Sequence, residues 1–136
     1  MMKNCPICNG NLYKETRDGT IPYKNKTLTF EMKGDYCEVC GEGFHNDSEQ
    51  KKITNSILLA KRTADELLAP KEVKRIRLKA KLTQVQAQDI FGGGVNAFSK
   101  YERAEVTQPR ATDLLLRLID NKEVSVEQLH QLRHIG

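Results

Sequence analysis

Four cysteines give the strongest chemical signal in this chain. They lie in two Cys-x-x-Cys motifs, CPIC at residues 5–8 and CEVC at residues 37–40, with 28 residues between them. A two-residue spacer lets both thiolates of a motif face one ion, and two motifs complete a tetrahedral site of four sulfurs. The sequence therefore predicts one structural zinc ion per chain, with four ligands: Cys5, Cys8, Cys37 and Cys40. Four thiolates leave no open coordination position, so we do not expect this zinc to be catalytic.

Redox chemistry and disulfide bonding are the alternatives for the same cysteines. No βαβ pattern surrounds either motif, which argues against a thioredoxin-like function. Disulfides need an oxidising compartment, and the N-terminus, MMKNCPIC, lacks the apolar segment of a secretory signal. Mean hydropathy is −0.59, and no apolar run approaches the 18 or so residues of a membrane span. We expect a cytoplasmic protein that does not bind a membrane.

Three consecutive glycines, Gly92 to Gly94, raise a second question, because glycine-rich loops can bind phosphate. A phosphate-binding P-loop needs a preceding strand and a lysine directly after its last glycine. Here a helical pattern precedes the glycines, Val95 follows them, and the GxGxxG motif is absent. Glycine readily adopts the positive φ values of a tight interhelical turn. The glycines are therefore interpreted as the turn of a helix-turn-helix.

Helical patterns fill the second half of the chain. Five helices are expected, and the first has Val73, Ile76 and Ala80 on one face. The second runs from the Thr83 capping box to Phe91, and the third runs from Val95 to about Arg103 with Phe98 and Tyr101 buried. The fourth contains Leu114, Leu115, Leu118 and Ile119, and the fifth is capped by Ser125.

The segment between the two cysteine motifs is typical of a small sheet. Leu28, Phe30 and Met32 alternate with polar residues, which predicts a half-buried strand. Residues 11–16 form a weaker strand candidate, and Asp18-Gly19 is interpreted as a turn. A helix is expected to start at residues 47–50 and to continue to about Leu68.

Charge and proline together suggest a division near Pro70. Residues 1–69 hold ten basic and ten acidic side chains, whereas residues 70–136 hold twelve and eight, so the net charge of +4 lies in the second half. A chain of 136 residues can form two small domains. We predict an α+β protein with a zinc-bound β-sheet and helix module at residues 1–69. Residues 70–136 are expected to form an all-α, five-helix helix-turn-helix domain.

The run LTQVQAQDIFGGGVNAFSKYE resembles the Xre/Cro-type helix-turn-helix through its LTQ start at residue 82 and its SKYE ending at residue 102. Together with the paired cysteine motifs, the segment FGGGVNAFS resembles the MqsA, or YgiT-type, zinc-finger antitoxins across nearly the whole chain. This resemblance implies that the zinc module binds and blocks a small messenger-RNA-cleaving toxin of the MqsR type. It also implies that the helical domain forms a homodimer and represses the toxin–antitoxin operon, which requires an inverted-repeat operator in double-stranded DNA.

The resemblance also assigns DNA-contacting residues. Asn96 matches the base-reading asparagine of the family, and Lys100 occupies the position of its second reader, an arginine. Lysine can donate to guanine, but without the bidentate fork of arginine. We expect Gly94 to cap the recognition helix, which would place Asn96 in its first turn. The remaining candidate DNA contacts are Thr83, Gln84, Ser99 and Arg103, of which Ser99 and Arg103 are expected to contact phosphate or solvent.

Two other functions compete with an antitoxin. A zinc-containing Xre-type regulator without a toxin would have the same motifs. An enzyme would need a catalytic constellation, and no Ser/His/Asp or paired-carboxylate arrangement stands out, so we expect no enzymatic activity.

One further departure from the Xre pattern is Ala104, because glycine is common at that position, and we expect the helix exit to differ there.

Overall fold

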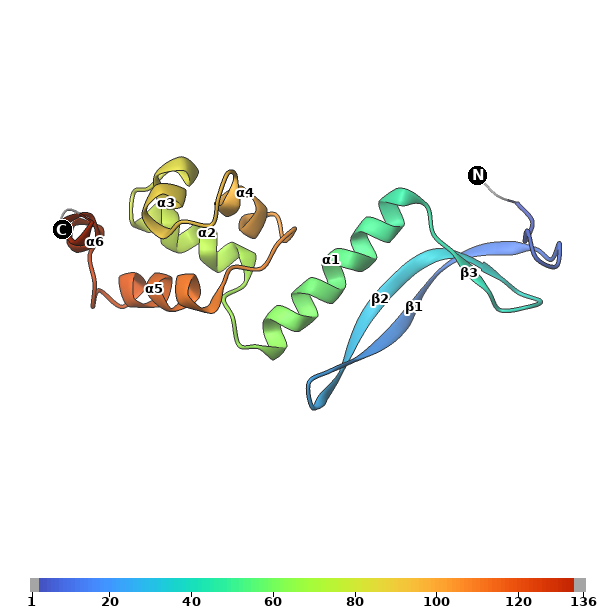
Figure 1. The fold of residues 1–136 in the computed structure, drawn as a ribbon. Coiled ribbons are helices and arrows are strands. Elements are labelled where there is room, and N and C mark those ends of the chain that lie inside the picture. Colours follow the sequence, from blue (N-terminus) through green and yellow to red (C-terminus); the bar gives the residue numbers. More distant parts are fainter. Residues whose placement is uncertain (1–2, 134–136) are drawn as a thin grey trace. The chain divides into compact units, whose positions relative to one another are not determined.

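The computed structural model describes residues 3–133, which contain three strands and six helices (Figure 1). The chain divides into two compact units, Met1–Lys61 and Arg62–Gly136. The division falls inside the first helix, whereas the sequence predicted a boundary at residues 69/70. Within the described residues, no helix is both long and apolar enough to span a membrane.

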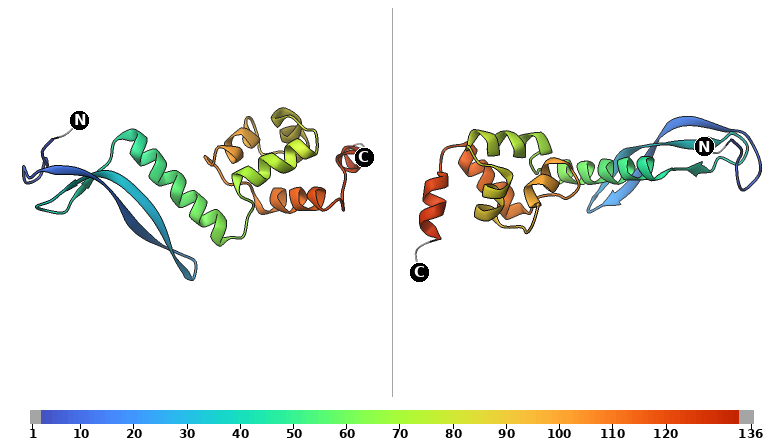
Figure 2. Two further views of the ribbon diagram at one scale, coloured as in Figure 1. Left: turned by 180° about the vertical axis from the view of Figure 1, so that it is seen from behind. Right: turned by 90° about the horizontal axis from the view of Figure 1, so that it is seen from above.

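The first unit contains a long antiparallel hairpin, which forms a twisted ribbon (Figures 1 and 2). Strands β1 (Leu12–Tyr23) and β2 (Lys26–Cys37) pair from Leu12 opposite Cys37 to Tyr23 opposite Lys26. A short strand, β3 (Gly43–Phe44), pairs with the end of β2 and completes the order β1-β2-β3. The hairpin thus gives structure to the long segment between the two cysteine motifs.

The prediction of a turn at Asp18-Gly19 is wrong. Both residues lie in the middle of β1, opposite Glu31 and Phe30. A Cβ atom at Gly19 would lie 2.8 Å from the Phe30 ring, so glycine at this position lets the ring approach the β1 backbone. The chain turns instead at residues 24 and 25, where Lys24 has a φ of 55°.

Helix α1 (Asp47–Ala64) begins where the sequence predicted. A reciprocal cap between Asn46 and Glu49, which was not predicted from the sequence, lies at its start. The Glu49 backbone N–H donates to Asn46 Oδ1 at 2.8 Å, and the Asn46 N–H donates to Glu49 Oε1 at 3.0 Å. Glu49 also forms an ion pair with Lys14 of β1, with Nζ 3.0 Å from Oε2. The same carboxylate therefore caps the helix and connects it to the sheet. The helix ends at Ala64, earlier than the predicted Leu68.

The second unit contains the five helices that the sequence predicted: α2 (Pro70–Lys79), α3 (Gln84–Phe91), α4 (Ala97–Glu102), α5 (Arg110–Asp120) and α6 (Val126–Leu132). Pro70 opens α2 instead of lying in a linker, because the first helical residue needs no N–H donor. The core of this unit consists of Val73, Ile76, Leu82, Ala87, Ala97, Phe98, Tyr101 and Leu116.

The apolar set predicted for helix α5 identifies only part of its buried face: Ile119 packs against the core, but Leu116 was not in the set. Leu116 is fully buried, whereas Leu114 has 52% of its surface exposed. Five of the six residues from 114 to 119 are apolar, so their spacing does not select one face. The buried face also includes Thr112 and Asp113, two polar residues that an apolar pattern cannot identify.

Two polar networks hold the second unit together. Arg62 is buried and donates to the Tyr101 and Val106 carbonyls and to Gln108. Gln108 and Asp113 both bind the Leu68 backbone. Gln108 Nε2 donates to the Leu68 carbonyl at 3.0 Å, and the Leu68 N–H donates to Asp113 Oδ1 at 2.8 Å. These bonds fasten the chain after α1 to the start of α5.

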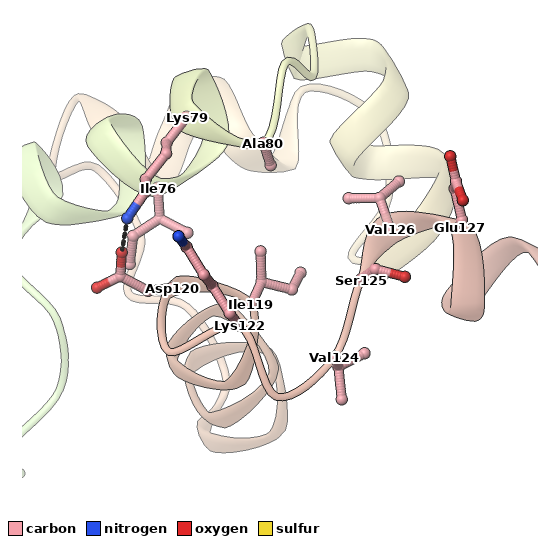
Figure 3. A pocket seen from close by; sticks show the side chains of 10 residues that line it. All are labelled: Ile76, Lys79, Ala80, Ile119, Asp120, Lys122, Val124, Ser125, Val126 and Glu127. Carbon is pink, nitrogen blue, oxygen red and sulfur yellow. Dashed lines mark hydrogen bonds and ion pairs between the residues drawn. The ribbon is translucent and has the colours of Figure 1, made fainter.

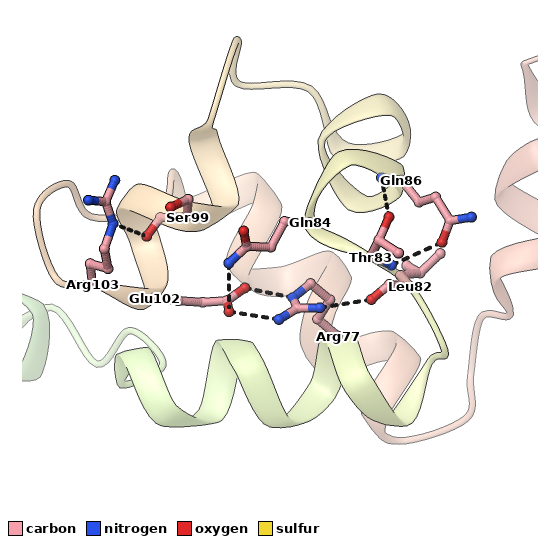
Figure 4. Close-up of polar contacts among 8 residues, drawn as sticks. All are labelled: Arg77, Leu82, Thr83, Gln84, Gln86, Ser99, Glu102 and Arg103. Atoms are coloured by element: carbon pink, nitrogen blue, oxygen red, sulfur yellow. Dashed lines mark hydrogen bonds and ion pairs between the residues drawn. The ribbon is translucent and has the colours of Figure 1, made fainter.

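The second network joins α2 to α4 (Figure 4). Arg77 and Glu102 form a bidentate ion pair, with distances of 2.7 and 2.9 Å, and both side chains are buried. Arg77 also donates to the Leu82 carbonyl at 2.9 Å. The charge of Arg77 is therefore paired inside the unit, although the sequence places Arg77 in a run of basic residues.

Candidate metal centre and nucleic-acid interface

The four cysteine sulfurs lie together, within 4.8 Å of one another. Cys5 Sγ is 3.7 Å from Cys40 Sγ, and Cys8 Sγ is 3.4 Å from Cys37 Sγ. Four sulfurs at the usual zinc–sulfur length of about 2.3 Å would be about 3.8 Å apart in a tetrahedron. The donor set and its spacing therefore fit one closed zinc site.

Both cysteine motifs have the same backbone geometry, which explains why they meet. The residue after each second cysteine has a positive φ: 63° at Asn9 and 79° at Gly41. Each turn is closed by a hydrogen bond to the first cysteine carbonyl, from the Asn9 N–H at 2.8 Å and from the Gly41 N–H at 3.1 Å. The register of β1 and β2 brings the two turns to one end of the hairpin, since Leu12 lies opposite Cys37.

Backbone N–H groups point at the sulfurs. The Cys40 and Val39 N–H groups lie 3.5 and 3.4 Å from Cys37 Sγ, and the Ile7 N–H lies 3.4 Å from Cys5 Sγ. The Cys40 N–H, followed by the Val39 N–H and the Cys8 and Cys40 thiols, outweighs desolvation and lowers the pKa of Cys37 to about 6. The Glu42 N–H lowers the pKa of Cys40, but desolvation and the neighbouring thiols outweigh it and raise that pKa to about 12. The backbone donors thus favour the thiolate form of Cys37, which is the form that binds a metal.

Arg17 supports the second cysteine turn from β1. Its Nη1 donates to the Gly41 carbonyl at 3.2 Å, and its guanidinium lies 4.0 Å from the centre of the Tyr36 ring. Nothing in the spacing of residues 17 and 41 in the sequence indicates this contact.

The three glycines do turn the chain between α3 and α4. Gly92, Gly93 and Gly94 have φ values of 78°, 100° and 90°. Gly93 also allows close packing, because a Cβ atom there would lie 2.6 Å from the Tyr101 hydroxyl. As predicted, Phe98 and Tyr101 of α4 are buried.

The structure corrects the predicted start of the recognition helix. Asn96, not Gly94, is the N-cap of α4, and its backbone is left-handed, with a φ of 60°. Its side chain is exposed and makes no capping hydrogen bond, while its backbone N–H donates to Gln88 Oε1 at 2.8 Å. Lys100 is exposed in the last turn of α4.

The other candidate DNA contacts surround the same two helices (Figure 4). Thr83 is the N-cap of α3 in the capping box that the sequence predicted, and Gln84 donates to Glu102 at 3.3 Å. Ser99 is half-buried. Arg103 follows α4; its Nε donates to the Ser99 carbonyl at 3.2 Å, and its Nη1 lies 3.1 Å from Glu105 Oε1. All six candidates thus lie in α3, in α4 or at the caps of these two helices, which the glycine turn joins.

Comparison with known proteins identifies the family. A family model described as the antitoxin component of bacterial toxin–antitoxin systems, MqsA, matches residues 2–133. Antitoxin MqsA of Escherichia coli (strain K12) is 34% identical over 134 residues, which cover 95% of this chain and 98% of the relative. The chain belongs to the MqsA antitoxin family. In the setting of this zinc-binding family, the four-cysteine cluster is a zinc site.

Proposed function

We propose that this MqsA-family antitoxin inhibits a small messenger-RNA-cleaving toxin of the MqsR type through its N-terminal unit. We further propose that it represses its own operon through its C-terminal unit. The family match over residues 2–133 supports the toxin-binding half of the proposal. The Asn96 side chain, exposed and not used for capping at the start of α4, supports the DNA-binding half. The proposal places the protein in the cytoplasm and gives this chain no catalytic step.

In the proposed complex, α4 enters the major groove. The amide of Asn96 can donate to and accept from adenine, and Lys100 can donate to the acceptors of guanine. Ser99 and Arg103 would contact phosphates beside them. Thr83 and Gln84, at the start of α3, would meet the backbone from the other side of the groove, as first helices of this motif do.

A second copy of the chain would complete the DNA-binding form. No residue of α6 is buried, and Leu132 is 62% exposed. A cavity of about 490 Å³ lies where α2, α5 and α6 meet, with Ile76, Ile119 and Val126 among its lining residues (Figure 3). A seven-residue helix has little stability of its own, so a dimer partner on this face would stabilise α6. Two recognition helices would then read half-sites about 34 Å apart in an inverted repeat.

The DNA-binding half is tested with Asn96→Gly. Glycine keeps the left-handed backbone at φ 60° without strain, so the substitution removes only the side chain. We expect the ratio of operator to random-DNA affinity to fall by about 10- to 100-fold. Arg103→Ala is the matched control, because loss of a phosphate contact weakens both affinities alike. Both are measured at one salt concentration; an unchanged ratio for Asn96→Gly contradicts the proposed reading.

The toxin-binding half is tested with a purified messenger-RNA-cleaving toxin of the MqsR type, which the proposal expects the adjacent reading frame to encode. The Asn96→Gly chain is expected to inhibit RNA cleavage as well as the wild type does. A Cys37→Ser chain is expected to lose inhibition, since its zinc site is broken. Full inhibition by a zinc-free Cys37→Ser chain would contradict the assignment of toxin binding to the N-terminal unit.

A further inference from the structure

We propose that Gln88 is a positioning residue for base recognition: its side-chain oxygen holds the Asn96 backbone in the conformation that presents the Asn96 amide to DNA. The inference rests on the proposed DNA-binding function and deepens it. Its central contact is the hydrogen bond from the Asn96 N–H to Gln88 Oε1, at 2.8 Å.

Asn96 caps α4 in an unusual way. Thr83 and Ser125, the caps of α3 and α6, have extended backbones, and each side chain accepts a hydrogen bond from its own helix. Asn96 has a left-handed backbone, and its side chain accepts no such bond. Its side chain is therefore free for a ligand, and its backbone must be held by another group. Gln88 supplies that group.

The turn before Asn96 has few other restraints. Glycine loses more conformational entropy on ordering than any other residue, and three glycines are adjacent here. The positions where Cβ atoms of Gly92 and Gly94 would lie have no neighbouring atom within 4 Å. Only Gly93 packs closely, against Tyr101 and Ala97. Hydrogen bonds therefore contribute much of the order in this turn.

Gln88 bonds to both ends of that turn. Its backbone carbonyl accepts from the Gly92 N–H at 2.8 Å, and its side chain accepts from the Asn96 N–H. Gln88 lies on α3, which is fixed in the core through Ala87. The half-buried Gln88 side chain thus fixes the position of Asn96 relative to α3.

The test compares variants of the full-length zinc-loaded protein on operator and random DNA. Gln88→Leu removes the acceptor and is expected to lower the ratio of the two affinities by about 5- to 10-fold, the worth of one hydrogen bond. Gln88→Glu keeps an acceptor oxygen and is expected to retain the ratio, although its charge weakens binding to both DNAs. Gln50→Leu, at an exposed position of α1, is the control for a glutamine-to-leucine change.

The double variant Gln88→Leu/Asn96→Gly separates the possible outcomes. If Gln88 acts through Asn96, the double variant has the same ratio as Asn96→Gly alone. A ratio within about twofold of the wild type for Gln88→Leu, beside a large loss for Asn96→Gly, overturns the inference and leaves the proposed function intact. No loss for Asn96→Gly overturns both.

A second measurement needs no variant. The Asn96 amide proton of the wild-type protein is expected to exchange with solvent at least about tenfold more slowly than in an unstructured peptide. Exchange at the peptide rate would show that the Gln88 bond is absent in solution and would overturn the inference.

Discussion

Ala104 has a left-handed backbone, which glycine adopts more readily than alanine does. The sequence predicted a different helix exit here, because this position is commonly glycine in Xre-type proteins. The φ of Ala104 is 62°. The Ala104 N–H donates to the Tyr101 carbonyl at 3.2 Å, and the Glu105 N–H donates to the Lys100 carbonyl at 3.0 Å, which closes α4 as a glycine would.

Ala104→Gly is therefore expected to stabilise the protein. Alanine in this region carries a steric cost of about 1 kcal/mol that glycine does not, so we expect the free energy of unfolding to rise by about that amount. The matched control is Ala80→Gly, because Ala80 follows α2 with an ordinary φ of −76°. Glycine there is expected to destabilise by roughly 0.5–1 kcal/mol. Thermal unfolding of both variants measures the difference; equal effects would contradict the strain at Ala104.

The zinc ligands could be predicted residue by residue, because thiol chemistry and a two-residue spacer determine what they bind. Residues that act through tertiary contacts could not. Gln88 and Asn96 are eight positions apart and meet only because the glycine turn reverses the chain. Likewise, Arg62 and Gln108 form a hydrogen bond although they are 46 residues apart in the sequence. No local pattern indicates that Arg62 is buried.

At the scale of elements, the segment between α1 and α2 is held more firmly than a linker. Asp113 of α5 accepts from the Leu68 N–H and from Gln108 Nε2, and its other oxygen accepts from Arg117 Nε at 2.8 Å. Arg117 also donates to the Glu66 carbonyl at 2.7 Å. One buried carboxylate thus organises the segment between α1 and α2.

Asp113→Asn is expected to destabilise the second unit by about 2 kcal/mol at pH 7, since hydrogen bonds to a charged group are lost. Burial raises the pKa of Asp113, but the Leu68 N–H, Gln108 and Arg117 outweigh it, so the pKa lies below its ordinary value of 3.8. A lowered pKa gives stability that is complete above the unfolded value and is lost as the pH falls below it. The difference between wild type and variant is therefore expected to shrink from pH 7 to pH 3 in urea unfolding. A difference independent of pH would contradict this account.

Other elements show where periodicity succeeds and where it fails. The capping boxes at Thr83 and Ser125 and the strand through Leu28 were predicted from local sequence, because caps and alternation are local rules. The turn at Asp18-Gly19 was wrong because glycine serves two purposes. It turns chains, and it also makes room for a facing ring such as that of Phe30.

At the scale of the whole molecule, the two units depend on different forces. The second unit has a contiguous apolar core, whereas the buried apolar residues of the first are few: Cys5, Leu28, Tyr36, Cys37 and Ile53. Structural zinc contributes about 10–16 kcal/mol in small fingers, more than such a core can supply. The folding of the first unit is therefore expected to require the metal.

Removal of zinc from the full-length protein by a strong chelator is expected to unfold the first unit and leave the second folded. NMR signals of Leu28 and Ile53 would collapse, while those of Phe98 and Leu116 would stay dispersed. Acid acts in the same direction, because protons compete with zinc for the thiolates. Cys37→Ser is expected to reproduce the chelator effect. A chelated chain that keeps the Leu28 and Ile53 signals would contradict a folding role for the metal.

The position of Arg62 bears on how such a gene can recombine. Arg62 lies in α1 by sequence, yet its guanidinium bonds to residues of the C-terminal unit, including Gln108. A crossover between related genes at residues 69/70 would join the arginine of one parent to the Gln108 loop of the other. A crossover at residues 61/62 would inherit both from the same parent. Functional chimeras are therefore expected to join inside the helix and not at the proline that follows it.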